Sequence, residues 1–315
     1  MTKNLIVYVG AVEGYEALRD EASDRATTKH VAADADVLCD SLAFADALLD
    51  ASMKVRITDD IVRNAPMLRV ISCATTGSDH IERPELDRRR IPVHTLREDG
   101  ELLQSITPAA ELSWALILAA ARRLAPALSH TSEGLWVREE FPGLMLNGRQ
   151  LGLIGCGRIG RWMSRYGIAF GMHVVGHDPY ADPWPEEIEK LSIEKVIESS
   201  DVISVHVHLS DETRGLISAD LFQRFKPGAI FINTSRGGVA DEAALLKALQ
   251  SGRIGAAGLD VLDGEPEILD HPLVAYAREN DNLLITPHCG GFSPDAVRRV
   301  CRRAAEKILP YLDGN

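Results

Sequence analysis

Residues 151–160 read LGLIGCGRIG, an apolar run that ends in three glycines with the spacing Gly155-x-Gly157-x-x-Gly160. A second apolar run, HVVGHD, ends on Asp178, eighteen residues after Gly160. A strand, a glycine turn, a helix and a second strand that ends in an acid together form the βαβ unit that binds dinucleotides. The first glycine allows a tight turn, the second lets the backbone approach a pyrophosphate at the positive end of the helix, and the third lets helix and strand pack closely.

The acid at position 178 indicates which dinucleotide this unit accepts. Asp178 can accept hydrogen bonds from both ribose hydroxyls, and its charge repels a 2′-phosphate. Pro179 and Tyr180 follow it, so no arginine stands there to pair with such a phosphate. The sequence therefore predicts NAD rather than NADP as the cofactor. The alternative is a glycine turn in some other kind of α/β protein.

Strand-like and helical runs alternate along all 315 residues. The strand-like runs are continuously apolar, which is typical of parallel strands that are covered on both faces. They are NLIVYVG (4–10), LRVISCA (68–74), QLGLIGCG (150–157), HVVGHD (173–178), VISVHVHL (202–209), AIFINTS (229–235), AAGLDVL (256–262) and NLLITPH (282–288). The fold class is therefore α/β.

The chain is long enough for two domains. The segment TPAAELSWALILAAARRLAPALSH (107–130) predicts one long apolar helix that begins near Pro108 and joins an N-terminal domain to the dinucleotide-binding segment. The tail predicts a last amphipathic helix, with Ser293 as N-cap and Pro294 at N1, that returns to the first domain. The expected domains are a substrate domain of residues 1–106 plus 287–315 and an NAD-binding domain of residues 107–286.

Composition limits the partners. A net charge of −12 argues against wholesale binding of nucleic acid, which needs a basic face. The start, MTKNLIVYVG, predicts a first strand rather than a signal peptide, and the most apolar stretch is limited by Glu111 and two arginines, so no membrane partner is expected. The five cysteines are scattered without CxxC spacing. They favour reduced thiols in the cytoplasm and no metal site.

Three further segments carry ionisable groups just after strands. Arg236 lies in a Ser-Arg-Gly-Gly turn, Asp260 and Glu265 follow another strand, and His288 follows a third. Each alone has an ordinary interpretation: a surface ion pair, a solvated loop acid, a turn cap. Together, at the strand ends where open parallel sheets bind ligands, they fit the reduction of a 2-oxo acid. Arginine suits a carboxylate, histidine supplies a proton near neutral pH, and a paired carboxylate fixes the histidine tautomer.

Seven stretches, in this order, resemble the D-isomer-specific 2-hydroxyacid dehydrogenases. They are RVISCATTGSDHIE (69–82), GLWVREEFPGLMLNGRQLGLIGCGRIGR (134–161), HDPY (177–180), SDVISVHVHLSDETRGLI (200–217), FKPGAIFINTSRGGVADEAAL (225–245), GLDVLDGEPE (258–267) and DNLLITPHCGG (281–291). The resemblance covers nearly the whole chain. It implies two Rossmann-like domains with parallel sheets, in which the NAD-binding domain is inserted in a flavodoxin-like substrate domain.

The resemblance also implies roles for individual residues. Arg236 binds the substrate carboxylate and polarises the carbonyl, His288 is the acid/base, and Glu265 is the carboxylate that pairs with it. Thr76 and Gly77 belong to a loop whose backbone N–H groups bind the substrate carboxylate. The implied cofactor-binding positions are Gly155, Gly157, Arg158, Ile159, Gly160, Asp178, His206, Thr213, Thr234, Ser235, Asp260, which contacts the nicotinamide amide, and Gly290. Cys289 is interpreted as a small buried neighbour of the histidine and not as a nucleophile.

The chain departs from the family's pattern in places. His208 stands where the family often has proline, and Ala109 where threonine or valine is common. Thr76 stands where phosphite-oxidising members carry lysine, which counts against that activity. An end at residue 315 is expected to leave no room for the regulatory domain of the long serine-pathway enzymes. Arg97 can meet a phosphate or a second carboxylate, or be solvated or ion-paired.

The expected function is NAD-dependent interconversion of a small D-2-hydroxy acid and its 2-oxo acid, of the glyoxylate or hydroxypyruvate type. Two alternatives stay open: a D-3-phosphoglycerate dehydrogenase and, from another class, an NAD-sensing binding protein of the co-repressor kind. A homodimer is expected through the long helix near 108–126.

Overall fold

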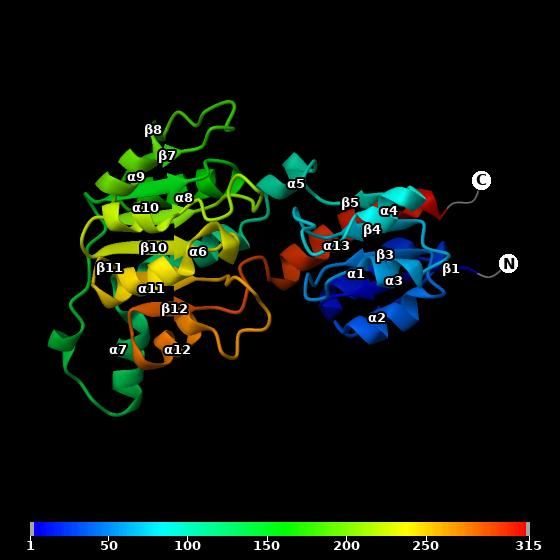
Figure 1. Ribbon diagram of the computed structural model, residues 1–315, viewed down its shortest axis with the longest axis horizontal. Coiled ribbons are helices and arrows are strands. Elements are labelled where there is room, and N and C mark those ends of the chain that lie inside the picture. The colour runs from blue at the N-terminus through cyan, green and yellow to red at the C-terminus, as the bar shows by residue number, and fades with distance from the viewer. Residues whose placement is uncertain (1–2, 313–315) are drawn as a thin grey trace. The chain divides into compact units, whose positions relative to one another are not determined.

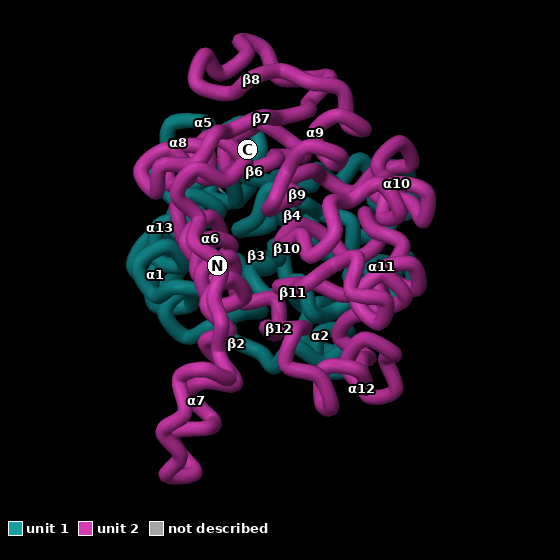
Figure 2. Tube along the Cα trace, turned by 90° about the vertical axis from the view of Figure 1, so that its left-hand side faces the viewer, with its two compact units in different colours: residues 1–106, 292–315 teal, residues 107–291 magenta. Residues whose placement is uncertain are grey.

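The computed structural model describes residues 3–312, which divide into two compact units, shown as a ribbon in Figure 1 and in two colours in Figure 2. One unit combines the chain up to Ile106 with the chain from Phe292 onward, and the other runs from Thr107 to Gly291. The chain enters the second unit once and leaves it once. The second unit is therefore an insertion in the first, and each unit has its own parallel sheet.

The sheet of the first unit has the strand order β2-β1-β3-β4-β5, with parallel pairing throughout. This is the flavodoxin-like order. Its strands are β1 (Asn4–Val9), β2 (Ala26–Val31), β3 (Ala47–Asp50), β4 (Val70–Cys73) and β5 (Val93–His94). Its helices are α1 (Val12–Ala22), α2 (Ala35–Leu42), α3 (Asp59–Arg63), α4 (Pro84–Arg89), α5 (Gly100–Gln104), α13 (Pro294–Ile308) and the short η3 (Leu309–Tyr311).

Helices cover both faces of this sheet. Along β1, Val7 and Val9 pack in a core cluster with α2, α3 and α4, whereas Ile6 and Tyr8 pack in a second cluster with α1 and α13. Successive side chains of a strand point to opposite faces, so a strand buried on both faces is apolar at every position. The N-cap of α13 is Ser293, as the sequence predicts, and its side chain accepts a hydrogen bond from the backbone of Ala296.

The sheet of the second unit has the order β12-β11-β10-β9-β6-β7-β8, again all parallel. Strand order reverses between β6 and β9, the switch point at which such folds bind ligands. Its strands are β6 (Gln150–Ile154), β7 (His173–His177), β8 (Glu189–Lys190), β9 (Val202–Val205), β10 (Ala229–Asn233), β11 (Ile254–Leu259) and β12 (Leu283–Ile285). Its helices are α6 (Pro108–Ala121), α7 (Leu124–Ser132), η1 (Arg138–Glu140), α8 (Arg158–Ala169), α9 (Ile193–Ser199), α10 (Ala219–Arg224), η2 (Gly237–Val239), α11 (Glu242–Gln250) and α12 (Pro272–Glu279).

The expected α/β class with two parallel sheets is confirmed, and each of the eight predicted apolar runs overlaps a strand. The sequence prediction did not include β2, β3, β5 and β8. Of these, β5 and β8 have two residues each, and β2 (ATTKHV) is an edge strand with mostly polar, exposed positions. Very short strands and polar edge strands lack the apolar signal on which the prediction depends. This reason does not apply to β3 (ALLD), a buried internal strand.

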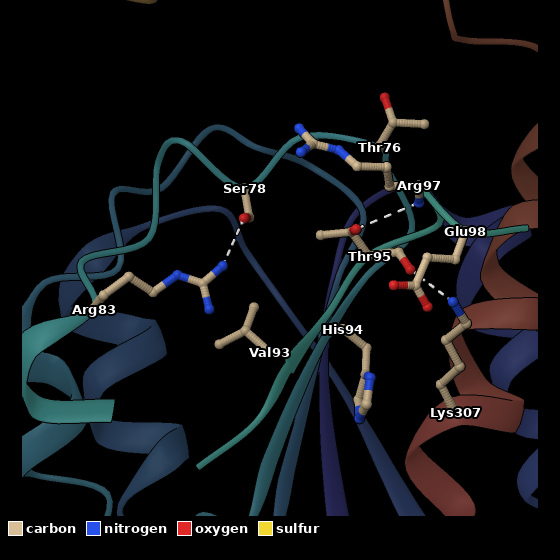
Figure 3. Close-up of a pocket in the computed structure, with 9 residues that line it drawn as sticks. All are labelled: Thr76, Ser78, Arg83, Val93, His94, Thr95, Arg97, Glu98 and Lys307. Atoms are coloured by element: carbon tan, nitrogen blue, oxygen red, sulfur yellow. Dashed lines mark hydrogen bonds between the residues drawn. The ribbon is translucent and has the colours of Figure 1, made fainter. Parts of the chain in front are cut away.

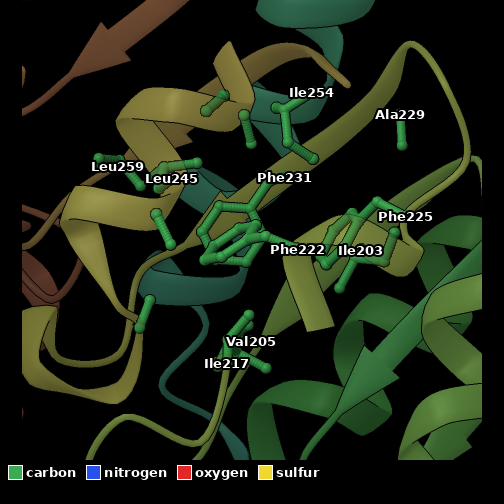
Figure 4. Packing of buried hydrophobic residues seen from close by; sticks show 14 of the residues in the cluster. Ile203, Val205, Ile217, Phe222, Phe225, Ala229, Phe231, Leu245, Ile254 and Leu259 are labelled. Atoms are coloured by element: carbon green, nitrogen blue, oxygen red, sulfur yellow. The ribbon is translucent and has the colours of Figure 1, made fainter. Parts of the chain in front are cut away.

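Three phenylalanines anchor one core of the second unit (Figure 4). The rings of Phe222 and Phe225 stack with centroids 5.3 Å apart, and Phe231 on β10 meets Phe222 edge-on at 5.4 Å. The neighbours of Phe231 in the strand, Ile230 and Ile232, belong to the cluster on the opposite face of the sheet. One strand therefore contributes to two cores.

The prediction of one long helix near 108–126 is wrong, because two helices occupy this segment. α6 ends at Ala121, Arg123 adopts a left-handed φ of 48°, and α7 begins at Leu124. Pro126 accounts for the break, since within a continuous helix its ring would clash with the preceding turn and leave a carbonyl without a partner. In the first turn of a new helix it is tolerated.

The stretch Gly100–Ala121 is long and apolar enough to cross a membrane by length and composition alone, a test that the core helix of a soluble protein also passes. In the structure this stretch is α5 and α6, separated by residues 105–107. α6 packs on β10 and β11, with Trp114 and Ile117 in the core. Its apolar character is therefore explained by burial on the sheet.

The phenylalanine core generates a stability prediction. Phe231→Ala removes a fully buried ring, and we expect it to lower the free energy of unfolding by about 3–5 kcal/mol. The matched control is Phe44→Ala, because Phe44 is 78% exposed and should change stability by only about 0.5 kcal/mol or less. Urea unfolding followed by circular dichroism measures both, and equal losses would contradict the core assignment.

Candidate active site

The glycine turn between β6 and α8 is built by backbone contacts. Gly155 has a φ of +94°, and a Cβ there would lie 2.5 Å from the carbonyl oxygen of His206. A Cβ on Gly160 would lie 2.2 Å from the carbonyl oxygen of Gly155. Gly157 differs, because a Cβ there would meet no atom within 4 Å. Gly155 and Gly160 are therefore needed by the fold, whereas Gly157 leaves open space at the start of α8, where a pyrophosphate fits.

Asp178 follows β7 and is tied to this turn. Its Oδ2 accepts a hydrogen bond from the backbone N–H of Cys156 at 2.8 Å, and its Oδ1 accepts one from Tyr180 at 2.9 Å. The half-buried carboxylate is thus fixed beside the open glycine with part of its acceptor capacity left over. This arrangement fits an adenosine ribose and disfavours a 2′-phosphate at the same place.

Two of the expected cofactor positions lie beside β9. His206 follows this strand, and its Nε2 is 2.8 Å from the Ser204 hydroxyl, while burial lowers the pKa of the ring to about 3. Within residues 3–312, its Nδ1 is buried without a hydrogen-bond partner. Thr213 closes the next loop, because its hydroxyl donates to the carbonyl of His208 at 2.6 Å and accepts from the N–H of Ser210 at 2.8 Å.

Arg158 and Ile159 are the first residues of α8, and both are half-buried. Burial lowers the pKa of the Arg158 guanidinium. Thr234 follows β10, and its hydroxyl lies 2.7 Å from that of Ser113 on α6. This contact joins α6 to the end of the sheet that carries the remaining candidates.

The turn that carries Arg236 is shaped by a buried asparagine at the end of β10. The side chain of Asn233 donates to the carbonyl of Arg236 at 2.9 Å and accepts from the N–H and the hydroxyl of Ser235, at 3.0 and 2.7 Å. The Arg236 guanidinium donates to the carbonyl of Ser235 at 2.8 Å. Asn233 was not singled out from the sequence, although a polar residue that closes an apolar strand was a usable signal.

A glycine brings this turn against the segment after β11. A Cβ on Gly237 would lie 2.1 Å from the backbone nitrogen of Asp263 and 2.1 Å from the carbonyl carbon of Leu262. Only a residue without a side chain allows such an approach. The backbone next to Arg236 therefore touches the segment that leads to Glu265.

Asp260 closes β11 and is 1% exposed. Its carboxylate accepts hydrogen bonds from the Thr286 hydroxyl at 2.6 Å, the N–H of Cys289 at 2.9 Å and the N–H of Gly290 at 2.7 Å. These three donors surround His288 in the sequence. Asp260, expected to contact the nicotinamide amide, thus also fixes the backbone on both sides of the histidine.

Glu265 and His288 form a pair. The Nδ1–H of His288 donates to Oε1 of Glu265, whose other oxygen accepts from the N–H of Leu262 at 3.1 Å. The side chains are 35% and 31% exposed. Because the carboxylate only accepts, it fixes the tautomer and leaves Nε2 as the outward nitrogen, which has no partner in the described chain.

His288 adopts a left-handed φ of 52°. This conformation costs a residue with a side chain on the order of 1–2 kcal/mol. The hydrogen bonds from the next two N–H groups to Asp260 offset that cost. The same bonds require Gly290, since a Cβ there would lie 2.8 Å from Oδ2 of Asp260.

The candidates of the second unit thus share one edge of its sheet. β10, β11 and β12 are adjacent parallel strands (Figure 1), and Arg236, Glu265 and His288 all follow their carboxyl ends. This edge offers a guanidinium, a histidine nitrogen and a carboxylate that holds the histidine. It is a set suited to binding an anion and moving a proton.

Thr76 and Gly77 lie in the first unit, in the loop after β4. The hydroxyl of Thr75 donates to the carbonyl of Gly77 at 2.7 Å. Below this loop His80 donates from Nε2 to the buried carboxylate of Asp50 at 2.6 Å. Sequence reasoning missed this pair, because Asp50 ends β3 whereas His80 lies in a turn 30 residues later in the chain.

The chain is similar to known enzymes. The family model described as "D-isomer specific 2-hydroxyacid dehydrogenase, NAD binding domain" matches residues 114–290. The hydroxypyruvate reductase of Thermotoga maritima is 33% identical over 302 residues, with 95% of each chain covered. The glyoxylate reductase of Aeropyrum pernix is 35% identical over 272 residues, 82% of this chain and 78% of that one.

The chain is also similar to solved structures. The D-lactate dehydrogenase of Aquifex aeolicus, complexed with NAD and lactic acid, superposes with a TM-score of 0.82 at 27% identity, covering 97% of this chain and 94% of that one. The chain also matches curated D-3-phosphoglycerate dehydrogenases, of which it spans about half the length.

The glycine turn predicts different effects for two substitutions, one on NADH binding and one on stability. We expect Gly157→Ala to keep the melting temperature within about 2 °C but to weaken NADH binding at least about tenfold, because the methyl group enters open space beside the helix N-terminus. Gly160→Ala should lower the melting temperature by several degrees, since its methyl group overlaps a carbonyl oxygen. Fluorescence titration and thermal unfolding measure these, and unchanged NADH affinity in Gly157→Ala would show that the pyrophosphate lies elsewhere.

Proposed function

Because the chain belongs to the D-isomer-specific 2-hydroxyacid dehydrogenase family, we propose that Arg236, Glu265 and His288 act on a small 2-oxo acid of the glyoxylate or hydroxypyruvate kind. The protein is an NAD-dependent oxidoreductase that interconverts 2-hydroxy and 2-oxo acids. The observation that carries the assignment of roles is the Glu265–His288 pair, which leaves Nε2 of the histidine outward at the sheet edge where Arg236 also lies.

Arg236 binds the substrate carboxylate in this proposal. Its guanidinium offers two parallel N–H groups, which match the two carboxylate oxygens. The turn held by Asn233 and Gly237 fixes the backbone that carries it. In the first unit, we assign the backbone N–H groups of Thr76 and Gly77 to binding a substrate carboxylate, a role that the family resemblance supports.

His288 moves the proton. In the reducing direction NADH, when bound, supplies the hydride, and Nε2–H of His288 gives a proton to the carbonyl oxygen. Glu265 stabilises the doubly protonated ring and holds its orientation. The buried Asp260 keeps the loop of His288 in place while the ring changes charge.

The cofactor residues present fit NAD. The open space at Gly157 accepts the pyrophosphate, and Asp178 is positioned for the ribose hydroxyls. We assign Arg158, Ile159 and Gly160 to the pyrophosphate-binding turn. The other proposed NAD-binding residues follow neighbouring strands of the same sheet. They are His206, Thr213, Thr234, Ser235, Asp260 and Gly290.

The alternatives are less well supported. The phosphoglycerate dehydrogenases that match are about twice as long as the matched segment, whereas the hydroxypyruvate reductase matches along nearly its whole length. The Arg236, Glu265 and His288 set favours catalysis over a binding protein of the co-repressor kind, and measured turnover distinguishes the two. We also propose a cytosolic location, which the five free cysteines favour.

The test of the function is NADH oxidation with glyoxylate and hydroxypyruvate, in the native enzyme and in His288→Asn. We expect turnover in the native enzyme and a fall in kcat of about 10²–10⁴-fold in the variant, because the amide cannot donate a proton in the same way. NADH affinity should stay nearly the same. Retained turnover in the variant would remove the proton-transfer role, and no turnover of any 2-oxo acid by the native enzyme would favour the binding protein.

We also propose that two copies associate through the segment after α6. α7 has no buried residue, and Leu128 and Trp136 are 61% and 89% exposed. Such apolar side chains, close together in the sequence, are typical of a surface covered by a partner. The family resemblance places the dimer contact in the same region.

We expect light scattering to give twice the chain mass of 34.4 kDa for the native protein, since a dimer buries these side chains. The variant Leu128→Arg/Trp136→Arg should be a monomer, because it places two charges in the contact. Leu269→Arg is the matched control, as Leu269 is 78% exposed elsewhere in the same unit. A native monomer would contradict the proposal.

A further inference from the structure

The first unit contains a cavity of about 240 Å³, and all but one of its lining residues have no role in the proposed function (Figure 3). The loop after β4 contributes Thr76 and Ser78, β5 and the segment after it contribute Thr95 and Arg97, and α13 contributes Lys307. The cavity is therefore formed entirely within one unit, and its wall includes a residue of the loop that we assign to the substrate carboxylate.

Two guanidinium groups face this cavity without an acidic partner. Arg83 and Arg97 reach it from opposite sides in Figure 3. Arg83 donates to the Ser78 hydroxyl at 2.9 Å, and neither arginine forms an ion pair with any carboxylate in residues 3–312. Acids outnumber basic residues in this chain by 46 to 34, and some other arginines of this unit, such as Arg69 and Arg88, form ion pairs. What sets Arg83 and Arg97 apart is that both line the same cavity. Two unpaired guanidinium groups at one cavity therefore indicate a ligand of opposite charge.

The other ionisable groups of the cavity leave a small positive charge. Lys307 forms an ion pair with Asp99 and donates to the carbonyl of Thr95 at 2.7 Å, so its charge is already balanced. Burial, and next the charge of Lys307, lower the pKa of His94, which is therefore neutral at pH 7. Glu98 also lines the cavity and offsets one of the two guanidinium groups. One positive charge remains, which matches a carboxylate better than the two negative charges of a phosphate monoester.

We propose that this cavity binds the second carboxylate of a 2-oxo dicarboxylic acid, with Arg97 as its principal contact and Arg83 as its second cation. The proposal rests on the proposed function, because it extends the substrate of the same reaction. Thr76 belongs to the loop assigned to the first carboxylate and also lines the cavity. The loop assigned to the first carboxylate therefore borders the proposed position of the second carboxylate.

The kinetic experiment compares two acids of equal carbon number that differ in the second carboxylate, 2-oxoglutarate and 2-oxopentanoate. We expect kcat/KM with NADH to be at least about tenfold higher for the dicarboxylate. Arg97→Gln should reduce this ratio about tenfold, the effect of losing a charged hydrogen bond. Arg97→Lys should retain part of the ratio as a point charge. Arg19→Gln, an exposed arginine on α1 away from the cavity, should leave it unchanged.

Three kinetic outcomes would overturn the proposal. The first is a native enzyme that prefers 2-oxopentanoate. The second is an equal loss with both acids in Arg97→Gln, which would assign Arg97 to the first carboxylate or to stability. The third is a higher kcat/KM with 3-phosphohydroxypyruvate than with 2-oxoglutarate, which would make the cavity a phosphate site.

A binding experiment separates this proposal from the proposed function. Glutarate and pentanoate are added at equal ionic strength, and thermal unfolding is recorded. We expect glutarate alone to raise the melting temperature of the native protein, and the shift to be lost in Arg97→Gln. If no 2-oxo acid is turned over, the function fails, yet a glutarate shift that depends on Arg97 still supports the cavity. Absence of the shift overturns the proposal.

Discussion

The buried carboxylate of Asp260 is the interaction on which the candidate active site depends. It joins the end of β11 to the loop after β12 through one hydroxyl and two N–H donors. A buried charge is stable only when its acceptors are filled, so the loop of His288 has little freedom to rearrange. Glu265, five residues farther along the same chain segment, then receives the histidine side chain. The segment after β11 thus fixes both the backbone of His288, through Asp260, and its ring, through Glu265.

Close backbone contacts at glycines are a second feature of the candidate active site. Gly155 and Gly160 let a strand, a turn and a helix pack together, Gly237 lets two turns touch, and Gly290 lets the histidine loop approach Asp260. Functional side chains mounted on such turns are positioned by backbone geometry. Because these turns touch through backbone atoms, side-chain rotamers at the contacts have little effect on where the functional side chains lie.

Much of the framework could be predicted from the sequence, because its signals are local. Continuous apolar runs identified the strands, and the residues directly after them placed Arg236, Glu265 and His288 at strand ends. Signals that require a partner far away in the chain were missed. The acceptor role of Asn233, the Asp50–His80 pair and the contact of Gly237 with Leu262 exist only once strands are aligned. The break between α6 and α7 does have a local signal, Pro126. The prediction of one long helix followed the apolar pattern instead of this proline.

Cys289, the neighbour of His288, has a chemical consequence for the protein. Burial raises the pKa of its thiol, and the negative charge of Asp260 raises it further. The same direction holds for the more deeply buried Cys73, Cys156 and Cys301. Thiolates, not thiols, react with peroxides and alkylating agents. Although a cysteine stands beside the proposed acid/base, its surroundings disfavour the thiolate, which is the form that reacts.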